Sequence, residues 1–371
     1  MLRTREDILE GRLRIPSGCA ISGIFSKSGK PIGGERIIKS IEVMHDRSNG
    51  LGGGFACYGI YPQFPDHYAI HVFHDNLASK RECEDFLLKN FDIASMSEIP
   101  TRLTSGVTDA PLIWRYFAEP LRHRVVEDFC DEDEFVARRV THINARIDGS
   151  YVFSSGKNMG VFKAIGFPED VGRFYRLEDY EGYCMIAHGR YPTNTPGWWG
   201  GAHPFALLSS SVVHNGEISS YDANRRSIEP YGYSCSLQTD TEVIAYIYDY
   251  LTRRVGLSQR EFADVVAAPF WSAIADMPKD RREYYEYIRA MFSNFLITGP
   301  FSIIVGFEGG MMALNDRLKL RSMVCAERGD TLYAASEECA IRVVEPELDR
   351  VWAPAGGEPV IATLGRPGGE R

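Results

Sequence analysis

The sequence predicts a layered α+β domain, in which helices pack against β-sheets. Strand-like apolar patterns occur both as hairpin-like pairs and with amphipathic helices between them. No period of roughly 20 to 50 residues repeats along the chain, and no Pro-rich or Gly/Ser linker divides it. At 371 residues, the chain has room for one large domain or two ordinary ones.

The first predicted elements alternate between helix and strand. Residues 4–7 (TRED) have the pattern of a capping box and predict a short helix that ends at Gly11. Residues 20–25 alternate small and apolar side chains, which is typical of a buried strand. Apolar residues recur at helical spacing over residues 34–44. The glycine-rich run 50–54 that follows predicts a tight turn beside a site, where the backbone passes closely.

Later patterns add further strands and helices. Apolar or alternating runs predict strands at residues 68–73, 151–153, 185–187, 206–213 (a strand or a hairpin), 301–307 and 331–335. Helical periodicity predicts helices at residues 81–91 and 241–252 and an interrupted helical block at 259–295.

Composition excludes several classes of protein. Hydrophobic residues make up 44% and charged residues 25% of the chain, as in a packed globule. The formal net charge of −9 provides no long-range attraction to nucleic acid or anionic lipid. No window reaches the roughly 18 consecutive apolar residues of a membrane-spanning helix, and the N-terminus lacks the apolar region of a signal peptide. We therefore expect a cytoplasmic protein that binds neither nucleic acid nor membrane.

Cysteine and histidine spacing gives no metal site. The eight cysteines include no C-x-x-C pair, which favours reduced thiols over a disulfide framework or a zinc ribbon. His67, His71 and His74 would share one face of a helix, but the pattern around them is that of a strand. On a strand His74 points away from the other two histidines, so we expect no bound metal.

Four short segments carry most of the chemical information. They are residues 18–25 (GCAISGIF), 188–195 (HGRYPTNT), 213–218 (VHNGEI) and 238–243 (QTDTEV). In this order they resemble the class II glutamine amidotransferases, which belong to the N-terminal-nucleophile hydrolases. Residues 190–205 and 214–218 look most similar to the amidotransferase part of archaeal-type glutamate synthase, and residues 315–321 and 335–341 resemble the end of that domain.

The resemblance implies a fold, a domain division and a nucleophile. The implied fold is a four-layer αββα N-terminal-nucleophile hydrolase sandwich of two mainly antiparallel sheets. Residues 1–18 would be a leader, and residues 19–371 the amidotransferase domain, whose first residue after cleavage is Cys19. The α-amine of a terminal residue has a pKa of about 7.7 to 8.0, so it can take the proton of its own thiol. A cysteine at the start of a strand is otherwise a small buried hydrophobic residue.

The resemblance also implies how the substrate is held. Arg190 would bind the α-carboxylate of glutamine through its planar fork of donors, although a surface ion pair is the plain alternative. Asp240 would receive the α-amino group of glutamine, and it would also cap the helix predicted to begin near Thr241. His188, which flanks a turn with Arg190, and Thr193 complete the implied substrate-binding set.

Two further implied roles concern the reaction itself. Asn215 and Gly216 would form the oxyanion hole, one through its side-chain amide and the other through its backbone N–H. The same Asn-Gly pair between apolar runs is also the strongest signal for a hairpin turn. Arg47 would orient the N-terminal residue, although Ser48 stands where the family usually has glycine.

The implied activity is hydrolysis of glutamine to glutamate and ammonia through a thioester on Cys19. Ammonia would pass to a glutamate-synthase-type partner subunit, which would also carry any FMN or iron–sulfur cluster, so we expect no cofactor in this chain. Three alternatives remain open. The chain could serve a different acceptor subunit, be a non-catalytic regulatory or scaffold protein that keeps its leader, or be a Cys/His hydrolase with His188 or His214 as base.

Overall fold

Two antiparallel sheets lie face to face at the centre of the molecule. The computed structural model describes residues 18–191, 197–237 and 239–365. In spatial order, the seven-stranded sheet contains β17 (Arg350–Trp352), β15 (Val324–Arg328), β16 (Thr331–Ala335), β1 (Ala20–Ser26), β10 (Cys184–Gly189), β3 (Gly53–Tyr58) and β8 (Met159–Ala164). The five-stranded sheet contains β11 (Phe205–Leu207), β12 (Ser210–Gly216), β13 (Phe301–Phe307), β14 (Gly310–Asn315) and β18 (Val360–Thr363).

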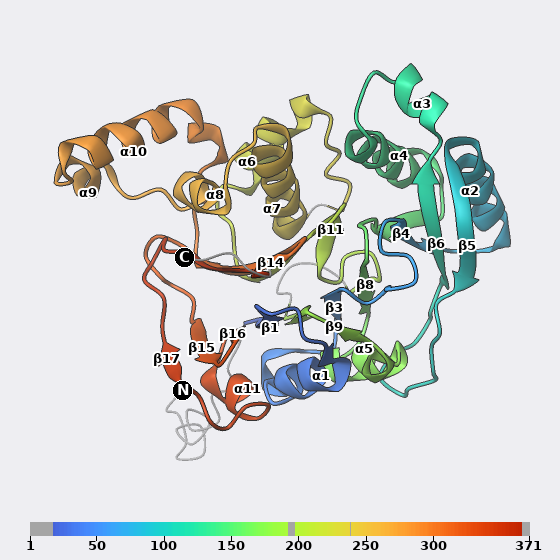
Figure 1. Cartoon of the computed structure of the whole chain (residues 1–371), viewed down its shortest axis with the longest axis horizontal. Helices are drawn as coiled ribbons and strands as arrows, with labels where there is room; N and C mark the ends of the chain where they lie inside the picture. The colour runs from blue at the N-terminus through green and yellow to red at the C-terminus, as the bar shows by residue number, and fades with distance from the viewer. Residues whose placement is uncertain (1–17, 192–196, 238, 366–371) are drawn as a thin grey trace, which may run out of the picture.

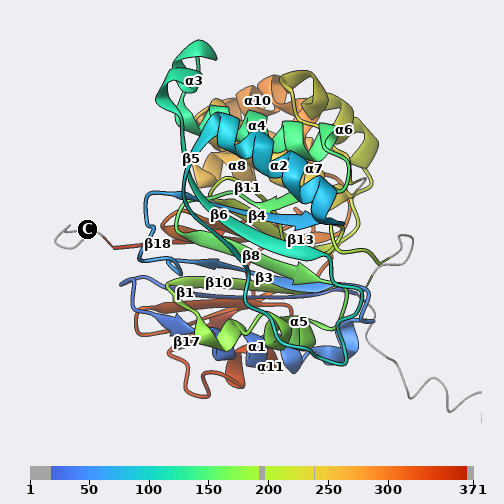
Figure 2. The same ribbon diagram turned by 90° about the vertical axis from the view of Figure 1, so that its right-hand side faces the viewer.

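Helices cover the outer face of each sheet. Helices α1 (Gly34–Glu42), α5 (Pro168–Phe174) and α11 (Glu338–Arg342) pack against the seven-stranded sheet. Helix α7 (Asp240–Asp249) packs on β11 and β12 of the five-stranded sheet, and α6 (Tyr221–Ile228) packs on α7. Figure 2 shows the resulting order of helices, sheet, sheet and helices. The predicted four-layer α+β sandwich is confirmed.

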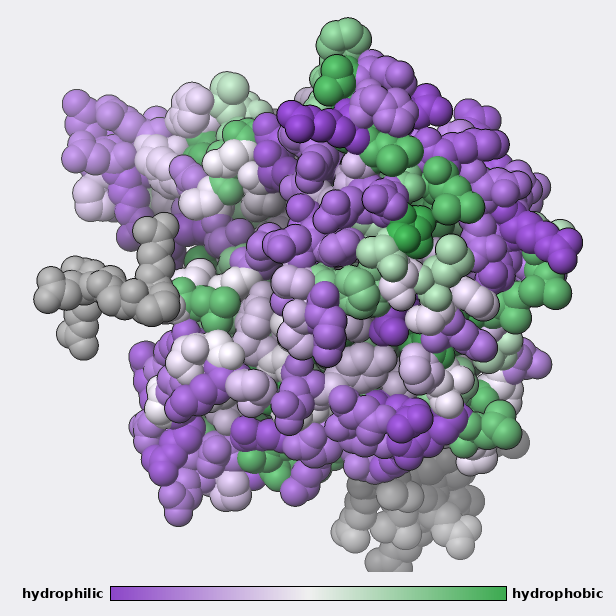
Figure 3. All heavy atoms as spheres, turned by 45° about the vertical axis from the view of Figure 1, so that its right-hand side comes forward, coloured by the Kyte–Doolittle hydropathy of each residue, from purple (hydrophilic) through white to green (hydrophobic). Residues whose placement is uncertain are grey.

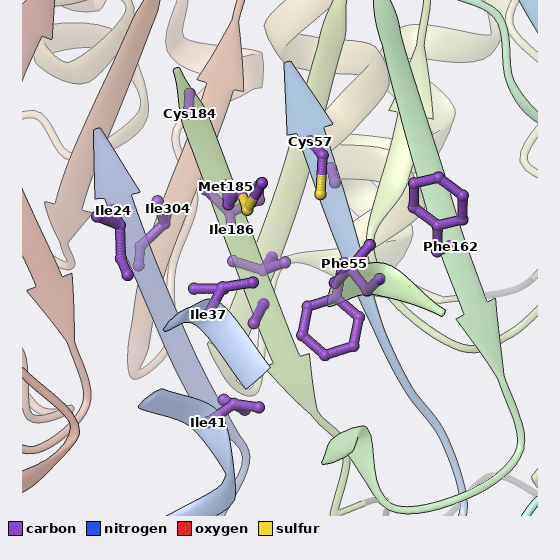
Figure 4. Close-up of a cluster of buried hydrophobic side chains, with 14 of the residues drawn as sticks. Ile24, Ile37, Ile41, Phe55, Cys57, Phe162, Cys184, Met185, Ile186 and Ile304 are labelled. Atoms are coloured by element: carbon purple, nitrogen blue, oxygen red, sulfur yellow. The ribbon is translucent and has the colours of Figure 1, made fainter. Parts of the chain in front are cut away.

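Strand β1 runs through the centre of this sandwich because its side chains are small or apolar. All seven residues of the strand are buried. On one side it contacts α1, whose Ile37 and Ile41 belong to the same core (Figure 4). On the other side it faces the second sheet, and a Cβ at Gly23 would lie 2.8 Å from Met311 Sδ. Glycine at this position therefore lets the two sheets approach each other.

A third sheet extends the molecule beyond the four layers. Its spatial order is β5 (Phe91–Glu98), β6 (Leu112–Pro120), β4 (Tyr68–His74) and β7 (Ser150–Ser154), accompanied by α2 (Leu77–Asn90), α3 (Arg122–Glu127) and α4 (Glu132–Arg146). All of these elements lie between β3 and β8 in the sequence, yet Tyr58 of β3 and Met159 of β8 are paired. The chain thus leaves the central sheet after β3 and returns beside it.

The remaining elements are short, apart from one helical lobe. Helices α8 (Gln259–Val266), α9 (Trp271–Ala275) and α10 (Lys279–Met291) form this lobe, at the upper left of Figure 1. The pair β2 (Ile32–Gly33) and β9 (Glu181–Gly182), the π-helical turn Tyr250–Arg254, and 3-10 turns at His45–Arg47, Leu177–Asp179, Glu229–Tyr231 and Ser293–Phe295 complete the described chain.

Most predicted elements are confirmed, with small shifts at their ends. The predicted 206–213 segment is the hairpin β11–β12, and the interrupted block at 259–295 is α8 to α10. The predicted helix at 4–11 lies outside the described residues. In the part of the chain that the structure describes, no helix is long and apolar enough to cross a membrane. The face in Figure 3 is mostly hydrophilic, with hydrophobic residues in small separate groups.

Candidate active site

Cys19 lies immediately before β1, at one end of the seven-stranded sheet. It borders a cavity of about 100 Å³. The residues that line this cavity come from distant parts of the sequence: Gly18, Cys19, Tyr191, Asn215, Gly216, Glu217 and Arg321. The fold therefore brings three of the predicted site residues, Cys19, Asn215 and Gly216, to one small space.

The surroundings of the Cys19 thiol act on its pKa in opposite directions. Burial raises the pKa above the ordinary thiol value, and the carboxylate of Asp240 adds to this effect. The Tyr191 backbone N–H donates to Sγ at 3.4 Å and lowers the pKa, as do the nearby charges of Arg190 and Arg321. Because the net shift is upward, the thiol needs a base to become a nucleophile.

Asn215 and Gly216 end strand β12 instead of forming a hairpin turn. Asn215 pairs with Ser302 and Gly216 with Phe301 of β13, so the hairpin alternative is wrong. Gly216 has a φ of +152°, and a Cβ there would lie 2.0 Å from the Pro300 carbonyl oxygen, so only glycine fits. Asn215 is fully buried, yet neither atom of its side-chain amide has a hydrogen-bond partner among the described residues. A buried amide without partners is costly, which is consistent with a donor kept for a ligand.

Arg190 is held in place by the glycine-rich segment before β3. Its backbone N–H donates to the Gly52 carbonyl at 2.9 Å, and its carbonyl accepts from Ser48 Oγ at 3.0 Å. Gly52 has a φ of +146°, and a Cβ there would lie 3.3 Å from Arg190 Cδ. The predicted close passage of the glycine run beside the site is confirmed. Arg190 is only 4% exposed, so its side chain does not lie on the surface.

Asp240 is the first residue of α7 and not its cap, in contrast to the prediction. Thr239 is the N-cap, since its side chain accepts from the Glu242 N–H. The Asp240 carboxylate accepts instead from the Ile218 N–H at 3.2 Å and lies 3.6 Å from His214 Nδ1. Burial alone would raise the pKa of Asp240, but His214 and these hydrogen bonds lower it overall. The side chain therefore carries a negative charge near Cys19 and Arg190.

His188 lies within strand β10 and does not flank a turn, which corrects the prediction. It is fully buried, its Nε2 is 2.9 Å from the His214 carbonyl oxygen, and its ring stacks on His203. Burial lowers the pKa of His188 to about 3. His188 is not among the residues that line the cavity. Thr193, the other predicted substrate ligand, lies outside the described residues.

The described residues offer no histidine base for Cys19. The hydrogen bond at Sγ comes from the Tyr191 N–H, and neither His188 nor His214 bonds to it within the described chain. An imidazole with a pKa of about 3, as at His188, is also a weak base. This arrangement disfavours the Cys/His hydrolase alternative.

Arg47 contacts the backbone of the predicted nucleophile. Its Nε lies 3.4 Å from the Cys19 carbonyl oxygen, and its Nη1 donates to Glu337 Oε1 at 2.8 Å. Gly18, which precedes Cys19, has a φ of +123° and lies close to the side chains of Arg321 and Asn215. The backbone on both sides of Cys19 is thus surrounded by polar side chains.

Three residues near Cys19 had no predicted role. Arg321 lines the cavity and its Nε is buried without a partner among the described residues. Tyr191 supplies the N–H on the thiol, and Glu337 holds Arg47. All three stand inside segments that carry the family resemblance, and this is the signal that could have identified them.

The described residues give no sign of a metal centre. They contain no group of three or more His, Cys, Asp or Glu side chains placed to hold an ion. His71 lies 3.0 Å from the Val161 carbonyl and also contacts Tyr61, whereas His74 contacts Ser150 and Tyr116. All eight cysteines are free, so no disulfide is present.

Comparisons with known proteins agree with this geometry. Residues 104–352 match the family model described as "Glutamine amidotransferases class-II". An uncharacterized protein of Archaeoglobus fulgidus is 47% identical over 349 residues, which cover 93% of this chain and 92% of that protein. The amidophosphoribosyltransferase of Methanocaldococcus jannaschii is 26% identical over 53% of this chain, and the glutamine amidotransferase-like protein GlxB of Rhizobium meliloti is 27% identical over 55%.

The chain spans only part of these last two relatives. The matched region is 36% of the Methanocaldococcus protein and 59% of GlxB. Among solved structures, a glutamine phosphoribosylpyrophosphate amidotransferase from B. subtilis aligns with 93% of this chain and 47% of its own, at 14% identity and a TM-score of 0.46.

Proposed function

Because the chain belongs to the class II glutamine amidotransferase family, we propose that it hydrolyses glutamine to glutamate and ammonia through a thioester on Cys19. The observation that carries this proposal is the unpartnered, buried amide of Asn215 on the same cavity as the Cys19 thiol. Arg190 and Asp240, two opposite charges near that thiol, suit the two charged groups of an amino acid.

The reaction begins with a proton transfer within Cys19. Its free α-amine takes the thiol proton, directly or through one water molecule, and Sγ attacks the side-chain amide carbon of glutamine. The carbonyl oxygen becomes an oxyanion, which the Asn215 amide and the Gly216 N–H stabilise. The carbon–nitrogen bond then breaks, the protonated amine returns its proton to the leaving group, and ammonia departs. Water hydrolyses the thioester, giving glutamate and restoring the thiol.

This mechanism requires removal of residues 1–18. While Gly18 is joined to Cys19, the nitrogen of Cys19 is an amide and cannot act as a base. Gly18 also occupies one wall of the cavity. We therefore treat residues 1–18 as a leader and residues 19–371 as the mature domain.

Intact-protein mass spectrometry and a glutaminase assay test the proposal together. We expect a species that begins at Cys19, with activity proportional to its abundance. Cys19→Ala abolishes activity, whereas Cys130→Ala, which changes a cysteine between α3 and α4, keeps it. Full activity in a chain that retains its leader would refute the mechanism. A stable, inactive chain that retains its leader would instead favour the regulatory or scaffold alternative.

For the acceptor, we propose a glutamate-synthase-type partner subunit that aminates 2-oxoglutarate and carries FMN and iron–sulfur clusters. Support for this choice is the resemblance of residues 190–205 and 214–218 to the amidotransferase part of that enzyme. The complex would work in the cytoplasm. Purification of the tagged chain from its native cells, followed by identification of the subunit that accompanies it, tests this choice. If the accompanying subunit is instead an enzyme that acts on a sugar or nucleotide precursor, the glutamate-synthase-type partner is contradicted and that enzyme is the acceptor.

A further inference from the structure

A second cavity, of about 390 Å³, lies in the helical lobe away from Cys19. It is bordered by α8, α10, the loop after β14 and residues 355–358. Three arginines line it, Arg260 from α8, Arg281 from α10 and Arg317 from the loop. Its volume is within the range of sites for small molecules.

These three arginines lack the acidic partner that a neighbouring arginine on the same helical lobe has. Among the described residues, Arg260, Arg281 and Arg317 form no ion pair with a carboxylate. By contrast, Arg282, the next residue on α10, pairs with Glu286 at 4.0 Å. Guanidinium groups gathered without carboxylates leave their positive charge available to an anion.

Arg317 is held in place by contacts that do not neutralise it. Its guanidinium stacks on the Phe270 ring at 4.0 Å and donates to the Ala268 carbonyl at 3.3 Å. Arg289 is close enough that burial first, and the charge of Arg317 second, lower the pKa of Arg289. The fold thus holds like charges together, an arrangement that a bound anion would stabilise.

Two carboxylates also border the cavity: Asp264 is engaged by tyrosines, and Glu358 is exposed, as Arg260 and Arg281 are. Asp264 is buried and accepts hydrogen bonds from Tyr284 and Tyr285, at 3.0 Å and 2.9 Å. Three arginines against two carboxylates leave the lining with a net positive charge.

The backbone of residues 356–357 completes the cavity. A Cβ at Gly356 would lie 2.6 Å from the Arg317 carbonyl oxygen, and Gly357 has a φ of +73°. Both positions therefore favour glycine, and the backbone comes close to Arg317. A ligand in the cavity can approach this backbone without meeting side chains.

We propose that this cavity binds a small polyanion, a molecule that carries two or more phosphate or carboxylate groups. Arg260, Arg281 and Arg317 would neutralise it through charge-assisted hydrogen bonds. The size of the cavity, about 390 Å³, favours a small molecule over an acidic segment of another protein.

The position of the cavity makes it an effector site, a reading that rests on the proposed function. Gly357 N–H donates to the Asn315 carbonyl, and Asn315 Nδ2 donates to the Arg321 carbonyl at 2.8 Å. Arg321 lines the Cys19 cavity. Residues 315–321 form the segment that places Arg321. A polyanion that contacts Arg317 touches this segment directly, and one that contacts Gly357 touches the residue that bonds to Asn315 at its start.

Calorimetric titration of the Cys19→Ala chain with pyrophosphate and with citrate tests binding without catalysis. We expect saturable binding of at least one probe. Arg281→Gln weakens it about 10- to 100-fold, and Arg282→Gln, the adjacent control, leaves it within about twofold at the same ionic strength. Binding of neither probe, equal loss in both variants, or binding of an acidic peptide alone would overturn the proposal.

The effector role is tested separately, by alkylation of Cys19 in the chain that keeps this cysteine. Pyrophosphate or citrate, whichever binds, changes the rate at which iodoacetamide alkylates Cys19 in the parent and in Arg282→Gln, but not in Arg281→Gln. An unchanged rate under saturating probe would overturn the effector role while the binding site stands. Because neither readout measures glutamine hydrolysis, failure of the proposed function would be seen separately.

Discussion

At the scale of single residues, unsatisfied polar groups mark the candidate site. The amide of Asn215 and the Nε of Arg321 are buried without hydrogen-bond partners among the described residues, and both residues border the Cys19 cavity. Folding gains nothing from such groups, since each costs about 1 to 3 kcal/mol when left unpaired. Their cost is explained if a bound substrate completes their hydrogen bonds.

Arg321 is expected to tune the reactivity of Cys19. Its positive charge lowers the pKa of the thiol, against the larger effect of burial. Arg321→Gln therefore raises that pKa, and each unit of increase reduces the thiolate fraction about tenfold. The rate of Cys19 alkylation by iodoacetamide as a function of pH, followed by mass spectrometry of the Cys19 peptide, measures this shift.

The control for Arg321 comes from the same loop. Lys319→Gln removes an equal charge two residues away, at a position that does not line the cavity. It should leave the alkylation profile unchanged. If both variants react at the parent rate, Arg321 has no influence on the thiol.

Asp240 is expected to matter for substrate and little for its helix. Asp240→Asn keeps an oxygen for the Ile218 N–H but removes the negative charge, so kcat/KM for glutamine falls about 10- to 100-fold, mainly through KM. Helix α7 keeps its Thr239 cap, so the loss of unfolding free energy is limited to the interaction of the carboxylate with His214. Steady-state kinetics and urea unfolding measure the two effects. Asp222→Asn on the surface of α6 is the control, and an equal KM in both variants would contradict the substrate role.

The sequence predicts a site residue best when its role depends on its neighbours in the sequence and not on the tertiary fold. Cys19, Arg190 and Asp240 stand in short characteristic runs, and the fold does bring their charges together. Asn215 and Gly216 carry the same local signal for a hairpin and for a strand end, and only their pairing with β13 decides between them. Arg321 acquires its role because the loop after β14 returns to Gly18, so that hydrophobic periodicity does not indicate it and only the resemblance of residues 315–321 does.

At the scale of elements, the confirmed predictions are those with a strong hydrophobic period. Strand β1 and helix α1 bury clear apolar patterns, so their positions follow from the sequence. Strand β5, with the sequence FDIASMSE, alternates between exposed and partly buried positions and contains few strongly apolar residues. Its weak pattern explains why the sequence does not predict β5. The apolar strand β6 (LIWRYFAEP) is missed without that reason, so the third sheet is predicted only through β4 and β7.

A buried pair of charges connects two of these elements. Lys163 of β8 and Glu242 of α7 are each about 1% exposed. Burial lowers the pKa of Lys163 to about 7 and raises that of Glu242 to about 7. Lys163 Nζ donates to the Gly200 carbonyl at 2.8 Å, and Glu242 accepts from the Leu237 N–H at 2.9 Å. The two side chains thus bind the backbone at Gly200, which follows Arg190, and at Leu237, which precedes Asp240.

Removal of both charges from this pair should reduce the unfolding free energy by less than the two single removals added together. Lys163→Met or Glu242→Gln alone removes the opposite charge near a buried group whose pKa is about 7, so that group turns neutral at a cost of about 1 to 3 kcal/mol. The double variant costs less than the sum of the two. Urea unfolding at pH 7 completes the double-mutant cycle. Strictly additive losses would show that the two groups act independently.

At the scale of the whole molecule, buried histidines predict sensitivity to acid. Burial lowers the pKa of His71 to about 3, of His74 to about 4 and of His188 to about 3. Between about pH 6.5 and 4 these groups are neutral in the folded state and protonated in the unfolded chain. The unfolded state therefore binds more protons, so stability falls as the pH falls through this window.

Urea unfolding at pH 7, 6 and 5 measures this dependence. Each buried histidine contributes at most about 1.4 kcal/mol per pH unit to the slope. In His71→Asn, the slope of the unfolding free energy against pH should decrease by the contribution of about one proton. His123→Asn, which changes an exposed histidine, should leave that slope unchanged. Constant stability from pH 7 to pH 5 would contradict the prediction.

The pairing of β3 with β8 has a consequence for how this chain can vary in length. The Gly59 N–H donates to the Asn158 carbonyl at 2.7 Å, so the chain enters and leaves the block that contains the third sheet at two adjacent residues. Insertions or excisions inside that block need not shift the register of β3, β10 and β1, whose paired residues Gly53, Gly189 and Ala20 lie beside Cys19. Related proteins can therefore differ in length between residues 59 and 158, while the residues around Cys19, at the opposite end of these strands, keep their relative positions.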